Sequence, residues 1–222
     1  MEFNRTPDGF ARRTGQSPQV VLMSDRTAYP VHASPKSLED IKSQSNYLRG
    51  AIAAELAGDS DHFTADTAQL LRHHGIYQHD DRDRRLQLGE QRSRQQETFQ
   101  FTVRTSVPGG ALTSRQLLAH IELAEKYGNG TLRFTNRQDL QLHGLAKADL
   151  RTVLRRIHES GLTTMAACGD VNHNVVCCPA PYRSDPVHAQ MQWMAGQIAA
   201  ALAPRTTAYQ EIWLGGNGCA HR

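Results

Sequence analysis

Residues 131–144, TLRFTNRQDLQLHG, constrain the fold of this chain more strongly than any other segment. Apolar and polar side chains alternate on both sides of a short polar turn, Asn136-Arg137-Gln138. Successive side chains of a strand point to opposite faces, so this period of two predicts two strands joined by a tight turn. The apolar face of the predicted pair carries Leu132, Phe134, Leu140 and Leu142.

The opposite face of the predicted pair is rich in hydrogen-bond donors. It combines two arginines, two amides and a histidine within eleven residues: Arg133, Asn136, Arg137, Gln141 and His143. A strand face that only meets water more typically carries Thr, Lys and Glu, and a solvated face is the plain alternative here. The fixed array of donors instead favours a large ligand that carries several carboxylates.

The segments around this strand pair predict a ferredoxin-like α+β unit. Alternating apolar residues predict a strand from about Phe99 to Ser106, and Pro108-Gly109-Gly110 predicts a turn. A capping box of Thr113 and Gln116 starts a helix, and a second helix over about 147–160 and a strand over 163–167 follow the pair. The order strand, helix, strand, strand, helix, strand is that of a ferredoxin-like half-domain, βαββαβ.

Each of the two helices should bury one apolar face. The expected buried residues are Leu117, Leu118, Ile121 and Ala124 in the first helix, and Leu150, Val153, Leu154 and Ile157 in the second. Gly128 and Gly161 are expected to end the two helices.

Helical segments are also predicted on either side of this unit. Ser34-Pro35 marks the start of a helical extension with an apolar stripe through about Ala57, and a short helix is expected near 66–73. Asp185-Pro186 starts a helix that runs to about Leu202, and we expect its Met-rich face to pack rather than to hold a cofactor. A short strand over 208–214 completes the expected elements.

Composition bears on the class of protein. The net charge of +3 is too small to argue for nucleic acid, and no apolar run is long enough for a membrane span. The N-terminus lacks the apolar core of a signal peptide, so we expect a cytoplasmic protein. The four cysteines include no C-x-x-C pair, and adjacent Cys177 and Cys178 would point to opposite faces of a strand. No zinc site or complete iron–sulfur site is therefore expected within the chain.

Several motifs, in order along the chain, resemble those of the sulfite and nitrite reductase family. TNRQ followed by QLHG, residues 135–144, looks like the sirohaem-binding signature of that family. The resemblance continues in RTSVPGG (104–110) and ACGDVNHN (167–174), and in YLRG (47–50) and HGIYQHDDRD (74–83). It runs from about Ser34 to Leu214 and is greatest to the haemoprotein (beta) subunit of sulfite reductase.

This resemblance implies six-electron reduction of sulfite to sulfide, or of nitrite to ammonia, on sirohaem coupled to a 4Fe-4S cluster. Electrons would come from a flavoprotein reductase subunit or from ferredoxin. By the match, Arg104 and His173 would be catalytic, binding the substrate anion, although a surface strand arginine is the plain alternative for Arg104. The residues implied to hold the cofactor are Arg133, Asn136, Arg137, Gln141, His143, Asn172 and Asn174.

One position departs from the family pattern. The family usually has Asn-Arg-Asn where this chain has Asn172-His173-Asn174. Histidine is shorter than arginine, lacks its fork, and is charged only part of the time near neutral pH. His173 either donates to the anion or to a cofactor carboxylate, or is a neutral histidine in a turn, and sulfite and nitrite both stay open as substrates.

Members of the family resemble a tandem of two related halves, and this chain matches the first. The cluster cysteines and the two substrate lysines of the second half have no counterpart here. We therefore expect an N-terminal half that is inactive alone, with a half that pairs with a second polypeptide as the alternative. The expected parts are a flexible tail (1–33), a helical or extended segment (34–96), the half-domain (97–168), the start of a sirohaem/iron–sulfur domain (169–214) and a non-family tail (215–222).

Two functions other than catalysis stay open. A ferredoxin-like module that binds RNA would need exposed aromatic residues on its central strands, whereas Phe134 is expected on the apolar side. A structural half could instead bind a partner chain through apolar surface that the absent half leaves uncovered.

Overall fold

The computed structural model describes residues 37–80, 99–168, 174–180, 182 and 184–204. All of them belong to one unit, Lys36–Arg222, and only this unit is described below. The expected tail of residues 1–33, the strand over 208–214 and the tail of residues 215–222 lie outside the described residues.

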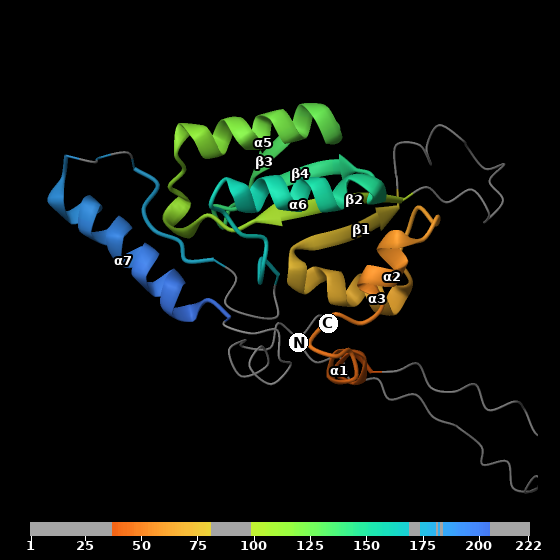
Figure 1. Ribbon diagram of the computed structural model, residues 1–222. Helices are drawn as coiled ribbons and strands as arrows, with labels where there is room; N and C mark the ends of the chain where they lie inside the picture. The colour runs from red at the N-terminus through yellow and green to blue at the C-terminus, as the bar shows by residue number, and fades with distance from the viewer. Residues whose placement is uncertain (1–36, 81–98, 169–173, 181, 183, 205–222) are drawn as a thin grey trace, which may run out of the picture. The chain divides into compact units, whose positions relative to one another are not determined.

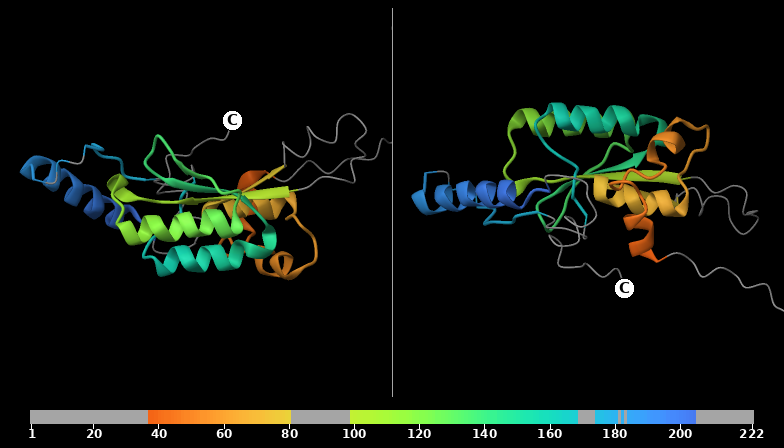
Figure 2. Two further views of the ribbon diagram at one scale, coloured as in Figure 1. Left: turned by 90° about the horizontal axis from the view of Figure 1, so that it is seen from above. Right: turned by 60° about the horizontal axis from the view of Figure 1, so that its bottom comes forward.

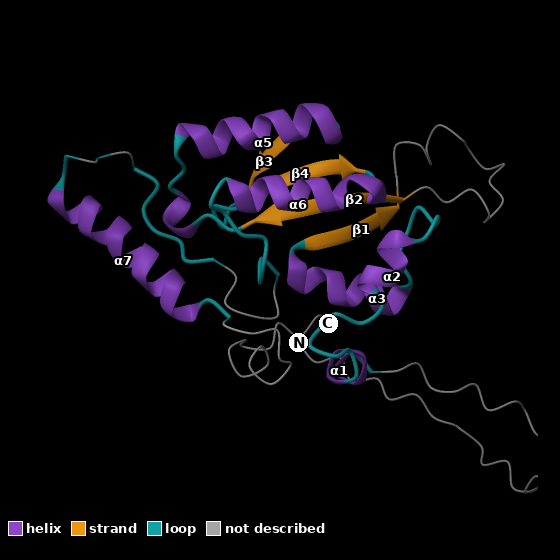
Figure 3. Ribbon diagram, viewed as in Figure 1, coloured by secondary structure: helices purple, strands orange, loops and turns teal. Residues whose placement is uncertain are grey.

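A four-stranded antiparallel sheet forms the centre of the described fold (Figures 1 and 3). Its strands lie in the order β1-β2-β4-β3. The expected strand pair is present as β3 and β4, with Leu132 opposite Leu142 and Arg133 opposite Gln141. The sheet and its helices make a mixed α+β, ferredoxin-like half-domain, as predicted. The strands are β1 (Ile76–Asp80), β2 (Phe99–Thr105), β3 (Leu132–Phe134) and β4 (Leu140–Leu145).

The edge of the sheet beside β2 differs from the prediction. The expected strand over 163–167 forms only one bridge, between Thr163 and Ser106. β1, from a segment without a readable pattern, takes the edge instead and pairs antiparallel with β2. The backbone N–H of Arg104 donates to the carbonyl of Gly75 at 2.8 Å, so this part of the β2 edge is already paired. The segment at Thr163 pairs beyond it, where the Ser106 N–H donates to the Thr163 carbonyl at 2.9 Å. The edge position of the last ferredoxin-like strand is thus filled from the N-terminal side.

Helices α5 (Ser114–Tyr127) and α6 (Leu150–Glu159) lie side by side on one face of the sheet (Figure 2). The capping box of Thr113 and Gln116 is present at the start of α5, as predicted. A 3₁₀ turn, η5 (Lys147–Asp149), leads into α6. The face of α6 is also as predicted, because Leu150, Val153 and Ile157 are buried and Leu154 is half-buried.

The buried face of α5 differs from the prediction. Ala124 is buried as predicted and Leu117 is half-buried. Leu118 is 58% exposed and Ile121 36% exposed, however, and His120 and Leu123 are buried instead. The apolar pattern alone could not place a histidine in the core. The structure does so because both ring nitrogens of His120 have partners, at 2.9 Å from the Gln116 carbonyl and 3.1 Å from Thr105 Oγ1. A buried polar group with both bonds made avoids most of the cost of desolvation.

The main core lies between the sheet and these two helices. Phe63, from the N-terminal segment, joins it and packs edge-to-face on Phe101 with 5.6 Å between ring centroids. The buried residues of this cluster are Phe63, Leu71, Ile76, Phe101, Val103, Leu123, Ala124, Leu142, Leu145, Leu150, Val153 and Ile157.

The N-terminal extension is helical, but it is not the continuous helix to Ala57 that the apolar stripe predicted. Helix α1 (Leu38–Ser43) starts at Ser37, which forms a capping box with Asp40, rather than at Ser34-Pro35. Asn46, Tyr47 and Leu48 then adopt left-handed backbone angles, which break the helix before α2 (Ile52–Ala57). Helix α3 (Ala65–Leu71) and the 3₁₀ turn η1 (Arg72–His74) follow and lead into β1.

Helix α7 (Pro186–Leu202) begins at the N-cap Asp185, as predicted. It lies against the 3₁₀ turn η4 (Pro108–Gly110), where the Gln192 side chain meets Gly109. The expectation that its Met-rich face packs is wrong for the described structure, because Val187, Met191, Met194 and Ile198 are all exposed.

Among the described helices, none has both the length and the apolar character needed to cross a membrane.

Candidate functional site

The candidate site is the sheet face opposite the one that α5 and α6 cover. Strand register places Tyr77 beside Thr102, and Gln141 between Arg104 and Arg133. Alternation along the strands gives this face its members, which are His79 and Tyr77 from β1, Thr102 and Arg104 from β2, Arg133 from β3, and Gln141 and His143 from β4.

Arg104 is held in place by two neighbours on this face. When the Gln141 amide is oriented with its oxygen toward the guanidinium, that oxygen accepts from Arg104 Nη2 at 2.9 Å and from Nε at 3.1 Å. The guanidinium carbon lies 4.9 Å from the centre of the Tyr77 ring, within the range of a cation–π contact. Tyr77 is in turn fixed, because its hydroxyl donates to the Ala167 carbonyl at 3.0 Å. The positive charge therefore occupies a defined position.

His143 lies half-buried beside Thr102, with 3.2 Å between its Nδ1 and the threonine hydroxyl. Burial lowers the pKa of His143, and the nearby charges of Arg133 and His79 lower it further. The ring is therefore neutral near neutral pH, and one of its nitrogens can donate. Its Nε2 is buried and has no hydrogen-bond partner among the described residues. A ligand acceptor at this face would satisfy that nitrogen.

The backbone of the turn between β3 and β4 is held by hydrogen bonds, while two of its predicted side chains are exposed. Thr135 Oγ1 accepts from the backbone N–H groups of Arg137 and Asp139, at 3.2 and 3.1 Å. The side chains of Asn136 and Arg137 are exposed. A fixed backbone with exposed donors suits a ligand that approaches from outside the sheet.

Gln138 and Asn174 tie this turn to neighbouring loops. The Gln138 side chain donates to the Cys177 carbonyl at 2.7 Å and accepts from the Cys177 N–H at 3.2 Å. The Asn174 amide donates to the carbonyls of Arg137 and Val107, at 2.8 and 3.0 Å, and accepts from the Ser106 hydroxyl at 3.1 Å. Asn174, predicted to hold the cofactor, thus supports the turn that carries Arg137.

The structure brings together some of the predicted site residues and leaves others undescribed. Gln141 joins Arg104 directly, and the charge of Arg133 acts on His143. Asn172 and His173 lie outside the described residues, so their roles stay predictions.

Sequence reasoning missed Thr102, which lies beside His143, and did not foresee that Tyr77 supports Arg104. The alternation Ile76, Tyr77, Gln78, His79 was a usable signal for β1, because it has the period of a strand. His74, Tyr77 and Gln78 all belong to the HGIYQHDDRD motif, which carries part of the family resemblance. Only Tyr77 is on the polar face. Gln78 instead brackets the backbone of Phe63, and His74 Nε2 lies 3.2 Å from the Leu48 carbonyl.

In the described part of the chain, no three His, Cys, Asp or Glu side chains are grouped so that they could hold a metal ion. Cys168, Cys177 and Cys178 are in the thiol form, with no disulfide among the described residues. The absence of a complete cluster site in the whole chain stays a prediction.

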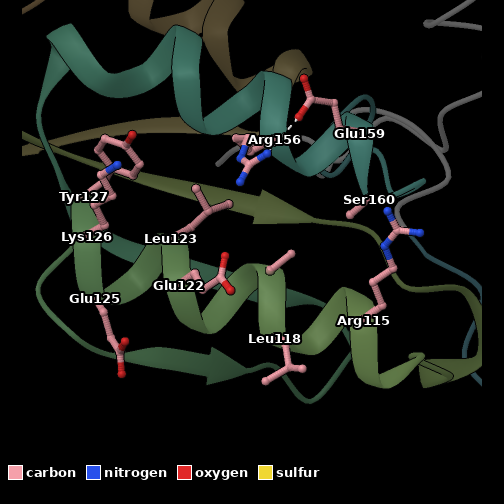
Figure 4. Close-up of a pocket in the computed structure, with 11 residues that line it drawn as sticks. Arg115, Leu118, Glu122, Leu123, Glu125, Lys126, Tyr127, Arg156, Glu159 and Ser160 are labelled. Atoms are coloured by element: carbon pink, nitrogen blue, oxygen red, sulfur yellow. Dashed lines mark hydrogen bonds and ion pairs between the residues drawn. The ribbon is translucent and has the colours of Figure 1, made fainter.

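A groove of about 890 Å³ between α5 and α6 lies on the other side of the sheet (Figure 4). Both acidic and basic residues line it, and Arg156 and Glu159 form an exposed ion pair at 3.3 Å. Such mixed surface charges favour no one class of ligand. This groove serves below as the reference surface for the polar face.

Known proteins share the sequence of the segment that forms this sheet and its helices. The profile of the nitrite/sulfite reductase ferredoxin-like half domain matches residues 92–160, which include β2, β3, β4, α5 and α6. Residues 92–160 are therefore a nitrite/sulfite reductase ferredoxin-like half domain. This half domain is that of the family which the TNRQ and QLHG motifs indicated.

Two curated relatives show the extent of the similarity. Over 187 residues the chain is 45% identical to the sulfite reductase (ferredoxin) of Synechococcus elongatus, covering 83% of this chain and 29% of the relative. It is also 45% identical, over 184 residues, to the sulfite reductase (NADPH) hemoprotein beta-component of Anoxybacillus flavithermus, covering 81% and 31%. The chain thus spans about three-tenths of the length of these relatives.

One solved structure supports the fold. The NirA protein of Mycobacterium tuberculosis superposes with a TM-score of 0.52 at 20% identity, covering 65% of this chain and 28% of NirA. At this identity the similarity concerns the fold alone.

Proposed function

We propose that this chain is the part of a sulfite reductase that forms one wall of a sirohaem site and supplies an anion-binding arginine. The observation that carries the proposal is the face on which Arg104, Arg133, Gln141 and His143 gather. The relatives named as sulfite reductases favour sulfite as the substrate. In this proposal residues 97–168 are the half-domain, and residues 169–214 begin a second, sirohaem- and cluster-binding domain.

The residues of the polar face fit a sirohaem. Its carboxylates would meet the exposed side chains of Arg133, Asn136 and Arg137, and arginine forks suit carboxylates well. In the tautomer with its proton on Nε2, neutral His143 would donate from that nitrogen to a further acceptor of the sirohaem. When bound, the sirohaem, coupled to a 4Fe-4S cluster, supplies the electron chemistry of the reduction.

Arg104 binds and orients the anion in this proposal. Gln141 and Tyr77 hold its guanidinium, so its charge needs little reorganisation when an anion arrives. The same fixed charge stabilises negative charge that builds up as electrons are added. Asn172 and His173 are proposed as further donors to the cofactor and to the anion, and Asn174 as the support of Arg137.

The electron donor is proposed by class only. One relative at 45% identity is named for ferredoxin and another at 45% identity is named for NADPH. Sequence identity therefore does not distinguish ferredoxin from a flavoprotein as the electron donor. We further propose that the 222-residue chain does not turn over sulfite by itself, because the relatives' remaining length would supply the cluster and the rest of the cavity.

Co-expression of the chain with sirohaem-synthesising enzymes tests the proposal. The purified chain should retain sirohaem, identified by its absorbance spectrum after extraction, and should prefer it to protohaem in a competition. Protohaem has fewer carboxylates for the arginines, so equal retention of the two would contradict the proposal. Retention of neither would contradict it as well.

A further inference from the structure

A second chemical centre lies away from the polar sheet face, where Cys178, His188 and Asp185 meet. Cys178 and His188 line a groove of about 700 Å³ between the glycine turn at η4 and the first turns of α7. Exposed aromatic residues form part of its wall, namely Phe134, Tyr182 and Trp193. None of these residues takes part in the proposed sirohaem site.

Asp185 and His188 are arranged to orient an imidazole toward the cysteine. As the N-cap of α7, Asp185 accepts the backbone N–H of His188 at 3.1 Å, and the same carboxylate oxygen binds His188 Nδ1. The Tyr182 ring packs edge-to-face on the imidazole, with 5.3 Å between ring centroids. With Nδ1 engaged by the carboxylate, the imidazole of His188 lines the same groove as Cys178.

The electrostatics of the trio favour a thiolate. Hydrogen bonding to Asp185, and then to Cys178, raises the pKa of His188. Hydrogen bonds from the Ala180 backbone and from His188 lower the pKa of the Cys178 thiol. Among the described residues, Asp185 and Cys178 act on His188, and His188 acts on Cys178. The phenol of Tyr182 packs beside the imidazole. A cysteine beside a protonated histidine is the usual setting of a reactive thiolate.

The surroundings of the neighbouring Cys177 favour its protonated thiol form. Cys177 Sγ donates to Gln192 Oε1 at 3.0 Å and lies 3.6 Å from the Gly109 carbonyl. Burial raises the pKa of Cys177, and the charge of Cys178 raises it further. Its backbone is clamped by Gln138. Two adjacent cysteines therefore differ in role, because Cys177 packs as a thiol donor while Cys178 is exposed.

We propose that Cys178 is a nucleophilic modification site that undergoes thiol–disulfide exchange with low-molecular-weight disulfides, with His188 as its partner and Asp185 as the positioning residue. The Cys178 thiolate attacks one sulfur of the disulfide, and a new S–S bond forms as the original S–S bond breaks. The other sulfur leaves as a thiolate, which takes a proton from solvent, so no further oxidant is needed. The aromatic wall of the groove receives the group that becomes attached.

The test uses the 222-residue chain with the substitution Cys219→Ser. This substitution removes a cysteine that lies outside the described residues. Dithiodipyridine and oxidised glutathione are the probes. Thione release or intact mass gives the rate, and peptide mapping gives the site. Cys178 should react first, and Cys178→Ser should abolish the fast phase whereas the matched Cys177→Ser keeps it. If a Cys178 or Cys177 variant fails to fold, peptide mapping of the Cys219→Ser chain still identifies the cysteine that reacts first. First modification at Cys177 or Cys168 would overturn the proposal.

Variants of the other two residues test the mechanism. His188→Gln should slow the fast phase by about tenfold near pH 6, and by much less near pH 9, where an ordinary thiol ionises unaided. Asp185→Asn keeps a good N-cap for α7 and should give a smaller loss in the same direction. A pH profile that is the same in His188→Gln and the unaltered chain would overturn the assignment of the imidazole.

Discussion

The two faces of one sheet have opposite chemistry, although the same strands make both. On the helix-covered face, Phe101, Val103, Leu142 and Leu145 are fully buried. On the other face, the same two strands, β2 and β4, carry the half-buried, polar Arg104, Gln141 and His143. The first face stabilises the fold through apolar burial, and the second uses hydrogen bonds to hold a charge and a neutral histidine in place. Because successive side chains of a strand point to opposite faces, neighbouring residues of β2 and β4 serve the core on one face and the candidate binding site on the other.

Truncation of the apolar face should give the largest effect on stability. Leu142 is fully buried in the main core, so Leu142→Ala should lower the free energy of unfolding by about 2–5 kcal/mol through lost burial and a residual cavity. Urea denaturation followed by circular dichroism measures this change. The control is Leu118→Ala on the exposed side of α5, which should stay within about 0.5 kcal/mol of the unaltered chain. Equal losses in the two variants would mean that the assignment of the faces is wrong.

Acidification should weaken the helix-covered face through its buried histidine. Burial lowers the pKa of His120, so on acidification the unfolded state binds a proton at a higher pH than the folded state does. Stability from this residue is complete above its ordinary pKa of about 6.5 and is lost as the pH falls below it. His120→Gln should flatten the dependence of the unfolding free energy on pH between about 5 and 7. A slope that is the same in His120→Gln and in the unaltered chain would contradict this account.

A smaller effect is expected from the residue that supports Arg104. Tyr77→Phe keeps the ring under the guanidinium but removes the hydrogen bond to the Ala167 carbonyl. The free energy of unfolding should fall by about 0.5–1.5 kcal/mol, which is the usual net worth of one such bond. The exposed Tyr47→Phe is the matched control, and a Tyr77→Phe loss no larger than that of the control would show that this bond does not hold the polar face.

Local patterns predicted the elements whose signals lie within a few residues. The strand pair around the turn, the capping box at Thr113 and the buried face of α6 depend on alternation, caps and helical spacing. β1 and the single bridge at Thr163 could not be predicted in this way, because two distant segments compete for one edge of β2. The same holds for the buried His120, whose place depends on Thr105, fifteen residues away.

For the candidate site, the sequence indicated the donors but not what holds them. Arg133, Gln141 and His143 could be read from their spacing within one motif. The supports of the site, Tyr77 and Thr102, come from other strands, and their roles appear only once the register is known. Asn174 is predicted from its motif to hold the cofactor, and that role stays a prediction; the structure adds that its amide binds the backbone of two loops.

The most direct test of the account compares binding and stability in one pair of double variants. In Arg133→Ala/Arg137→Ala, both exposed arginines of the polar face are lost, and charge-assisted bonds of about 1.5–3 kcal/mol each should go with them. Sirohaem affinity, titrated by absorbance, should fall at least about tenfold, while the free energy of unfolding stays within about 0.5 kcal/mol of the unaltered chain. Arg115→Ala/Arg156→Ala, on the reference surface between α5 and α6, should change neither quantity. Unchanged sirohaem affinity in the Arg133/Arg137 variant, or an equal loss in the Arg115/Arg156 control, would contradict the assignment of binding to the polar face.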